Sequence, residues 1–467
     1  MDRRIGIDSI GVYVPRLYVD LTGQWATVRA PLLTGGDVEK LIGKVVDGVG
    51  VRRMAVVDAH EDCATLAAMA AKRAIDAAGI DPRDIDYLAV GTETTVDQSK
   101  SIAAYVLGML ERHYDVRLPD VGAPQFQFAC IGATYALEAA VSRMRARDNS
   151  KPYSLVVASD VSSYPLGSAG EYTQGAGAVA LLLSENPRVV VLEQGLGATV
   201  TRDERDFFRP NDRRSAVVDG KYSIDVYLDC MEAAFDGYAR RFKDKVGGSI
   251  DQLSDAVDFF CFHVPFPRMA EYASARVLGR IWRDDPQVRA LEVATEKGGL
   301  SAEPRARKEL ERALLRTPFF RAAFERKVAP SLSIAREVGN VYSGALYLAL
   351  VSLLERTRGQ DVAGKRVLLG SYGSGASAKV FSGIVAPQYR TLVDQLHVHE
   401  DLRPESEGGL RIGLDVVQYE RLHELSDRER GASVRPPRSE FALERLGTSQ
   451  TPERTDIGYR YYGWVGG

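Results

Sequence analysis

The amino-acid sequence predicts an α/β protein built from two pseudo-repeated halves. Short apolar segments typical of buried strands alternate with helices rich in small residues, and the same order of segments occurs twice along the chain. Of the 467 residues, 45% are hydrophobic and 26% are charged, which is an ordinary composition for a globular protein with two large cores or one fused double domain.

The first half contains four segments in order. The stretch at 84–93 (DIDYLAVGTE) is a continuous apolar strand that ends in polar residues, and 130–140 (CIGATYALEAA) is a helix of small residues. A second strand follows at 154–160 (SLVVASD). A strand that begins with glycine, 175–184 (GAGAVALLLS), closes the half.

The second half repeats this order. The segments DAVDFFCFHVP, GNVYSGALYLAL, KRVLLGS and YGSGASAKVFSGIV correspond in turn to the four segments of the first half. Along the sequence, the two corresponding helices are separated by about 40 more residues than the two corresponding first strands. This difference predicts an insertion in the second half. We therefore expect a first half at 1–190 and a second half at 191–390, with a charged helical insertion near 280–327. A polar surface tail should follow at 391–467.

Composition excludes several classes of protein. Sixty Lys and Arg residues stand against 63 Asp and Glu residues, so no overall field draws the chain onto nucleic acid or anionic lipid. Asp8 and Pro15 interrupt the opening apolar segment, which alternates like a strand rather than a signal peptide, and no apolar run is long enough to span a membrane. We expect a cytoplasmic protein.

The cysteines and histidines predict no metal site. Cys63, Cys130, Cys230 and Cys261 form no CxxC pair, so they are interpreted as free thiols in a reducing compartment. His397 and His399 in HVHED have a weak spacing for metal ligands, and we predict no metal there either.

Cys130 is the candidate nucleophile. At the predicted start of a helix, free N–H groups and the helix dipole should favour its thiolate over the thiol. Gly132 and Ala133 should let a substrate approach closely and leave N–H groups for an oxyanion. Attack of a thiolate on a thioester changes the free energy little, because one thioester replaces another. The alternative is a buried structural cysteine.

Glu93 and His263 both lie where a predicted strand ends, and α/β proteins bind ligands at the carboxyl ends of strands. His263 could polarise a thioester carbonyl or carry a proton, or it could be a core histidine bonded to a backbone carbonyl. Glu93 could remove a proton from a bound acetyl group if burial raises its pKa, or it could be an ordinary loop carboxylate. Asn340 joins them from the second helix start.

Eight segments, in order along nearly the whole chain, carry a family resemblance. They are YVPRLYVDL, GTETTVDQSK, FACIGATYALEAA, ASDVSSYPLGSAGEYTQGAGAVALLL, DFFRPND with VVDGKYSIDVYL, FHVPFPRM, VGNVYSGALYLALVSLLE and GSYGSGASAKVFSGIV. In these segments the chain resembles hydroxymethylglutaryl-CoA synthase. The insertion before APSLSIAREVGN resembles the longer archaeal and bacterial forms of that enzyme.

The resemblance implies a thiolase-like fold of five layers, α/β/α/β/α. It also implies condensation of acetyl-CoA with acetoacetyl-CoA and water to hydroxymethylglutaryl-CoA and free CoA, an early step of the mevalonate route to isoprenoids. The CoA thioesters are substrates, and no further cofactor is implied. Proteins with this fold resemble one another in forming dimers, so we expect a homodimer and leave open an association with a thiolase.

The resemblance also implies residue roles. Cys130 would take the acetyl group, Glu93 would act as general base on its methyl group and general acid towards the ketone oxygen, and His263 would anchor and polarise the acetoacetyl thioester. Substrate or CoA contacts are implied at Asp37, Thr173, Ser223, Asn340 and Ser374.

The chain departs from the family pattern at two places. Many relatives place lysines five and nine residues after the histidine, where they meet the CoA phosphates; in this chain Arg268 and Tyr272 stand at these positions. Arg268 can bind phosphate in a fork, but Tyr272 supplies no second cation. Many relatives also have an aromatic residue directly after the cysteine, where this chain has Ile131.

Three other functions stay open. An initiating ketoacyl synthase uses Cys, His and Asn on the same fold but does not need Glu93. A synthase that branches polyketides on acyl carrier proteins uses the same catalytic trio. The missing second cation favours it, whereas VVDGKYS and the insertion favour the CoA enzyme. A non-catalytic scaffold subunit would be free to lose Glu93, Cys130 or His263, yet all three are present.

Overall fold

The computed structural model describes residues 3–148, 150–213, 215–294, 304–425, 431–451 and 455–466. Across these residues, none of the helices combines the length and the apolar character needed to cross a membrane. One continuous apolar core takes in residues from both predicted halves and from the C-terminal segment, from Ile5 on the first strand to Tyr462 on the last.

Five strands of the first half lie side by side in the order β1 (Ile5–Tyr13), β7 (Ala176–Glu185), β6 (Tyr153–Val161), β4 (Ile85–Gly91) and β5 (Gln125–Phe126). β4 and β6 are parallel, whereas β6 and β7 are antiparallel. The predicted strands at 84–93, 154–160 and 175–184 are confirmed. Each is a near-continuous run of buried residues, as expected of strands covered on both faces.

The second half repeats these pairings. β12 (Phe259–Phe262) is parallel to β13 (Arg366–Gly373), which is antiparallel to β14 (Ser377–Val385). The short strand β8 (Val190–Leu192) pairs with both β1 and β14 and so joins the two halves into one ten-stranded sheet; β9 (Ala198–Thr201) pairs with β14. The predicted duplication is confirmed in strand order and direction.

Helices complete the layers. α3 (Cys63–Ala78) packs on β1, β6 and β7, and α6 (Gly220–Val246) packs on β9, β13 and β14. α5 (Gly132–Ala146) packs on β4 and β6, and its Thr134 hydroxyl also reaches Ser371 of β13 and Tyr347 of α13 (Ala345–Arg356). The α5 and α13 helices therefore lie between the two halves of the sheet, with α3 and α6 outside, which is the expected α/β/α/β/α order.

Small residues in α5 are required by its close packing on β4. A Cβ added to Gly91 would lie 2.2 Å from the backbone of Ala133, and one added to Gly132 would lie 2.7 Å from the carbonyl oxygen of Phe126. We expected Gly132 and Ala133 to make room for a substrate. That interpretation is wrong, because the space beside them is filled by the chain itself.

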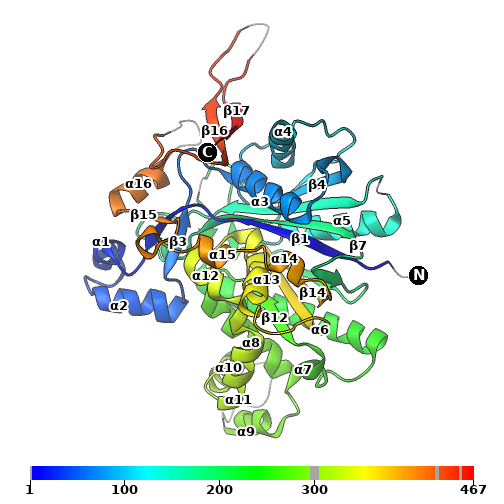
Figure 1. Ribbon diagram of the computed structural model, residues 1–467. Helices are drawn as coiled ribbons and strands as arrows, with labels where there is room; N and C mark the ends of the chain where they lie inside the picture. The colour runs from blue at the N-terminus through cyan, green and yellow to red at the C-terminus, as the bar shows by residue number, and fades with distance from the viewer. Residues whose placement is uncertain are drawn as a thin grey trace.

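The charged stretch near 280–327 is helical where the structure describes it, while residues 295–303 lie outside the described residues. It comprises α9 (Pro286–Ala294), α10 (Pro304–Leu314) and α11 (Pro318–Lys327), which follow α8 (Pro267–Ile281). Buried Arg276 of α8 binds Asp229 of α6 and Glu311 of α10. These helices lie together at the end of the molecule opposite the C-terminal hairpin (Figure 1).

The smaller elements cover the margins of this body. β2 (Leu17–Asp20), β3 (Arg53–Val56) and β15 (Ile412–Gly413) form a separate three-stranded sheet. The remaining helices of four or more residues are α1 (Gln24–Leu33), α2 (Val38–Ile42), the π-helix η1 (Gly43–Val49), α4 (Ile102–Tyr114), α7 (Leu253–Ala256), α12 (Ser333–Val338), α14 (Arg390–Val393), α15 (Val398–Asp401) and α16 (Val416–Glu424). The short 3-10 turns are η2 (Pro82–Asp84), η3 (Glu171–Thr173), η4 (Ala329–Ser331), η5 (Tyr342–Gly344) and η6 (Glu405–Glu407).

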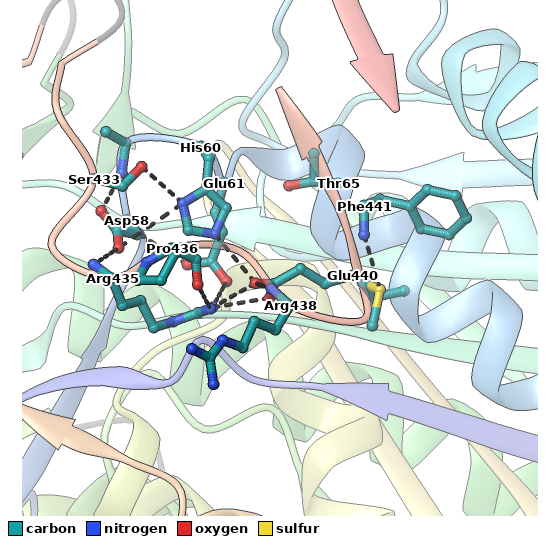
Figure 2. A network of polar contacts seen from close by, with 12 residues as sticks. Asp58, His60, Glu61, Thr65, Ser433, Arg435, Pro436, Arg438, Glu440 and Phe441 are labelled. Carbon is teal, nitrogen blue, oxygen red and sulfur yellow. Dashed lines mark hydrogen bonds and ion pairs between the residues drawn. The ribbon is translucent and has the colours of Figure 1, made fainter. Parts of the chain in front are cut away.

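The predicted C-terminal tail runs over the first half and ends in a hairpin, β16 (Glu440–Leu446) and β17 (Arg460–Val465), that projects beside α4 (Figure 1). A buried polar network attaches this C-terminal segment to the first half (Figure 2). Arg435 binds both oxygens of Glu440 at 2.5 and 2.9 Å and Glu61 at 3.2 Å. The domain boundaries themselves stay a prediction.

Candidate active site

The structure brings Cys130 and Glu93 together, 37 residues apart in sequence. Cys130 Sγ lies 3.9 Å from Glu93 Oε2, and Cys130 is partly exposed whereas Cys63, Cys230 and Cys261 are buried. Glu93 follows the end of β4, and Cys130 precedes α5, which packs on β4. Strand end and helix start therefore place a carboxylate beside a thiol.

The backbone of Glu93 is fixed by a hydrogen bond to Asp160. Its N–H donates to Asp160 Oδ1 at 2.8 Å, and Asp160 also accepts from Thr92 and Ser343. Glu93 is only 4% exposed, and burial raises its pKa to about 8, with the positive charge of Arg209 acting in the opposite direction. Such a carboxyl changes its protonation state near neutral pH, as a general base and acid must.

Cys130 follows a strained backbone position. Ala129 has φ of +40°, a left-handed conformation that a residue other than glycine adopts at a cost, and such strain is concentrated at functional sites. We expected the helix start to favour the thiolate. That expectation is wrong for the free protein: burial, then the carboxylates of Glu93, Asp160 and Asp206, raise the pKa of the Cys130 thiol well above its ordinary value, and α5 itself begins only at Gly132.

His263 directly follows β12, at the carboxyl end predicted for it. Its backbone N–H donates to Gly370 at 2.7 Å, and its carbonyl accepts from the Tyr227 hydroxyl at 3.0 Å. The ring is buried, and Nδ1 has no hydrogen-bond partner among the described residues. Burial lowers the pKa of His263 to about 3, so the ring is neutral at physiological pH and carries one N–H donor.

Asp206 and Tyr372 connect His263 with the cysteine. The Tyr372 hydroxyl donates to Asp206 at 2.8 Å, and the ring of Tyr372 lies 6.5 Å from that of His263. Asp206 is also among the carboxylates that raise the pKa of the Cys130 thiol, and a Cβ on Gly373, next to Tyr372, would meet Ile131 at 2.6 Å. The three predicted catalytic residues thus belong to one region where the two halves meet.

Four of the predicted binding residues bond to each other or to residues of this region. Asn340 is buried, and its N–H donates to the carbonyl of Thr173 at 2.9 Å. Ser223, in the first turn of α6, donates to Asp206 at 3.2 Å, and Ser374 hydrogen-bonds the side chain of Tyr372.

The other two lie elsewhere: Asp37 directly precedes α2, and Arg268, in the first turn of α8, contacts η1. Asp37 is exposed and caps α2 by accepting from the N–H of Lys40. Arg268 donates to the carbonyl of Asp47 in η1 at 3.1 Å and pairs with Glu271 at 2.6 Å. The cation expected to meet CoA phosphates is therefore already bound to a carboxylate of its own helix.

Sequence reasoning missed six residues around the pair of Glu93 and Cys130. Asp160 and Asp206 lie in segments that carry the family resemblance, ASD and DFFRPND, and for Asp160 a charged residue after an apolar run was a further signal. Tyr342, with φ of +38°, hydrogen-bonds Tyr164 and packs against Phe207 in a small cluster that also contacts Cys130. No signal in the sequence indicated that Arg209 lies against Glu93.

Comparison with known families and structures gives a consistent result. Residues 1–187 match the family description "Hydroxymethylglutaryl-coenzyme A synthase N terminal", and residues 190–405 match the corresponding C-terminal description. The chain is 33% identical to hydroxymethylglutaryl-CoA synthase of Haloferax volcanii over 95% of its length and 97% of the relative. It is 32% identical to that of Enterococcus faecalis over 90% and 91% of the two chains.

A solved structure of MvaS in complex with 3-hydroxy-3-methylglutaryl coenzyme A is 34% identical, covers all of both chains, and gives a TM-score of 0.81. The HMG synthase of the curacin biosynthetic pathway shares the fold, with a TM-score of 0.73 at 24% identity. The thiolase-like fold expected from the sequence is confirmed. This chain belongs to the hydroxymethylglutaryl-CoA synthase family.

Proposed function

We propose that the chain condenses acetyl-CoA with acetoacetyl-CoA and water to give hydroxymethylglutaryl-CoA and free CoA, as an acyltransferase of the mevalonate route. The observation that carries the proposal is the pair formed by the thiol of Cys130, a partly exposed residue, and the buried Glu93 carboxylate, with Sγ and Oε2 3.9 Å apart. A nucleophile that holds an acetyl group beside a base that can deprotonate its methyl group is what this condensation needs.

In the first step the Cys130 sulfur attacks the carbonyl of acetyl-CoA. Because the pKa of the thiol is raised, the thiol must give up its proton as it attacks, and that proton leaves on the CoA thiolate. One thioester is exchanged for another. The neutral ring of His263 has a single N–H, which is suited to hydrogen-bonding a thioester carbonyl rather than to supplying a full positive charge.

In the second step Glu93 takes a proton from the acetyl methyl group. The electron pair of that C–H bond forms the new bond to the ketone carbon of acetoacetyl-CoA, and Glu93 returns a proton to the ketone oxygen. Water then hydrolyses the thioester on Cys130 and frees the thiol. No step changes the net oxidation state, so the proposed reaction needs no redox cofactor.

We propose substrate contacts at Asp37, Thr173, Ser223, Arg268, Asn340 and Ser374. One observation favours a second candidate, a branching synthase that acts on acyl-carrier-protein substrates. Arg268 is engaged by Glu271, and Tyr272 supplies no second cation, so fewer charges are free for CoA phosphates than the family pattern provides. Similarity to CoA synthases above 30% over nearly the whole chain supports the first candidate.

We further propose a cytoplasmic homodimer that can associate with a thiolase. Size-exclusion chromatography with light scattering would test the dimer. Co-elution with a thiolase would test the association.

One experiment tests the main proposal. The protein is incubated with acetyl-CoA alone and then with acetoacetyl-CoA, either free or carried by an acyl carrier protein, and the products are identified by mass. We expect one acetyl group on the peptide containing Cys130, and hydroxymethylglutaryl-CoA after the second addition. An acetyl group on Cys63, Cys230 or Cys261, or product only on the carrier protein, would contradict the proposal.

A further inference from the structure

Arg209 makes the one ion pair of Glu93 found among the described residues. Its Nη2 lies 3.9 Å from Glu93 Oε1, and the same guanidinium donates to the main-chain carbonyl of Glu93. The two carboxylate oxygens thus face different partners, Oε1 towards Arg209 and Oε2 towards Cys130. Oε1 is buried and accepts no hydrogen bond from the described residues.

The position of Arg209 is fixed by the chain on both sides of it. It follows β10 (Phe207–Phe208), which pairs with β11 (Val217–Val218) in a hairpin over the site. Before the hairpin, Asp206 accepts from the Tyr372 hydroxyl and from the N–H of Gly375, both at 2.8 Å. Phe207 packs edge-on against Tyr342 at 6.2 Å. The guanidinium is therefore positioned beside Glu93 by a hairpin whose flanking residues are hydrogen-bonded to and packed against the second half.

The charged groups that act on Glu93 come from several elements, and Arg209 is the cation among them that favours the ionised carboxylate. Burial and the Asp160 carboxylate both favour the protonated, inactive form of the base, and Arg209 is the largest influence in the other direction. The titratable and charged groups facing Glu93 are Arg209 from the hairpin, Asp160 from the end of β6, Cys130 before α5, Tyr164 after β6 and Tyr342 from η5.

We propose that Arg209 is a positioning residue for the condensation step: it pairs with Oε1 of Glu93, favours the ionised form of the carboxylate, and leaves Oε2 directed at the acetyl group on Cys130. The inference rests on the function proposed above and assigns a residue to one of its steps. Removal of the methyl proton needs the ionised form of Glu93, whereas thioester exchange on Cys130 does not. Loss of Arg209 should therefore affect one half-reaction and spare the other.

The test uses Arg209→Gln, Arg209→Lys and a matched control, Arg213→Gln, which removes an exposed cation from the same hairpin. Two rates are measured from pH 6 to 10: acetylation of Cys130 by acetyl-CoA alone, and condensation by the pre-acetylated protein. Arg209→Gln should move the acid limb of the condensation profile upward by about one pH unit, which is roughly a tenfold loss at pH 7.5 that recovers towards pH 10. Arg209→Lys should recover most of the loss, and Arg213→Gln should match the parent.

Each alternative outcome identifies a different error. If Arg209→Gln lowers condensation equally at all pH values, or slows acetylation by the same factor, Arg209 is only structural and the inference is wrong. If Arg209→Lys behaves like Arg209→Gln although it folds, charge is not the property that matters, and the inference is again wrong. If the parent protein is not acetylated on Cys130 or forms no hydroxymethylglutaryl-CoA, the proposed function fails and the inference fails with it.

Discussion

Replacing Arg435 by methionine should loosen the C-terminal hairpin from the body of the protein. Arg435 bridges Glu440, at the start of β16, and Glu61, just before α3, and all three side chains are almost fully buried (Figure 2). The Tyr13 hydroxyl lies 2.8 Å from both carboxylates, so removal of the guanidinium leaves two acids facing each other across one hydroxyl. Methionine retains most of the apolar volume, so the change tests charge rather than packing.

The expected cost follows from the burial of these groups. Breaking a buried ion pair by removing one partner typically costs about 3–5 kcal/mol, because the remaining charge is left without compensation. The cost should fall at low pH. Without Arg435, the pKa of these carboxyl groups in the folded protein should lie above their pKa in the unfolded chain. The charged carboxylates then destabilise the fold once the pH exceeds the unfolded pKa, and protonation at lower pH relieves the loss. Burial already raises the pKa of Glu61 in the intact protein. The variant should therefore lose more stability at pH 8 than at pH 5.

Hydrogen exchange measures this directly, because it reports local opening of one segment without requiring two-state unfolding of the whole chain. The free energy of opening would be compared for peptides from β16 and from α3 in both proteins. Arg445→Met is the control: it removes an exposed ion pair with Asp456 on the same hairpin and should cost less than about 1 kcal/mol. Equal effects of the two substitutions, or a loss at pH 5 as large as that at pH 8, would refute the reasoning.

Three further predictions concern catalysis. Glu93→Gln should still acetylate Cys130 yet lose roughly 10²–10⁴-fold in condensation, measured on the pre-acetylated protein, and the roles assigned to the two residues would be wrong if acetylation failed instead. His263→Ala should raise the KM for acetoacetyl-CoA more than it slows acetylation, as steady-state kinetics with each substrate varied would show. Arg268→Ala should raise that KM by about fivefold, at the lower end for a guanidinium–phosphate contact because Glu271 competes for the side chain, and added salt should reduce the effect. Arg321→Ala removes the other cation beside Glu271 and should leave the KM unchanged, provided that CoA is held by Arg268 alone.

Local pattern was enough to predict the repeated unit and the positions of its reactive groups. Strands β4, β6, β7 and β13 are continuous apolar runs, and the carboxyl ends of parallel neighbours such as β4 and β6 lie at the same edge of a sheet. The predicted second helix at 339–350 shows the limit of this approach. Only α13, from Ala345, is a regular α-helix; the residues before it form the turn that holds Asn340 and the strained Tyr342.

The ionisation of the site was decided by tertiary structure alone. The sequence places Cys130 at a helix start and so predicts a thiolate, but the pKa of the thiol depends on burial and on Glu93, Asp160 and Asp206, which come from other segments. Arg209 lies 116 residues from Glu93 in sequence, and Arg435 lies 374 residues from Glu61. Residue type and spacing encode helices and strands because those depend on near neighbours. Electrostatic energy depends on distance and burial, which exist only once the two halves and the C-terminal segment have packed together.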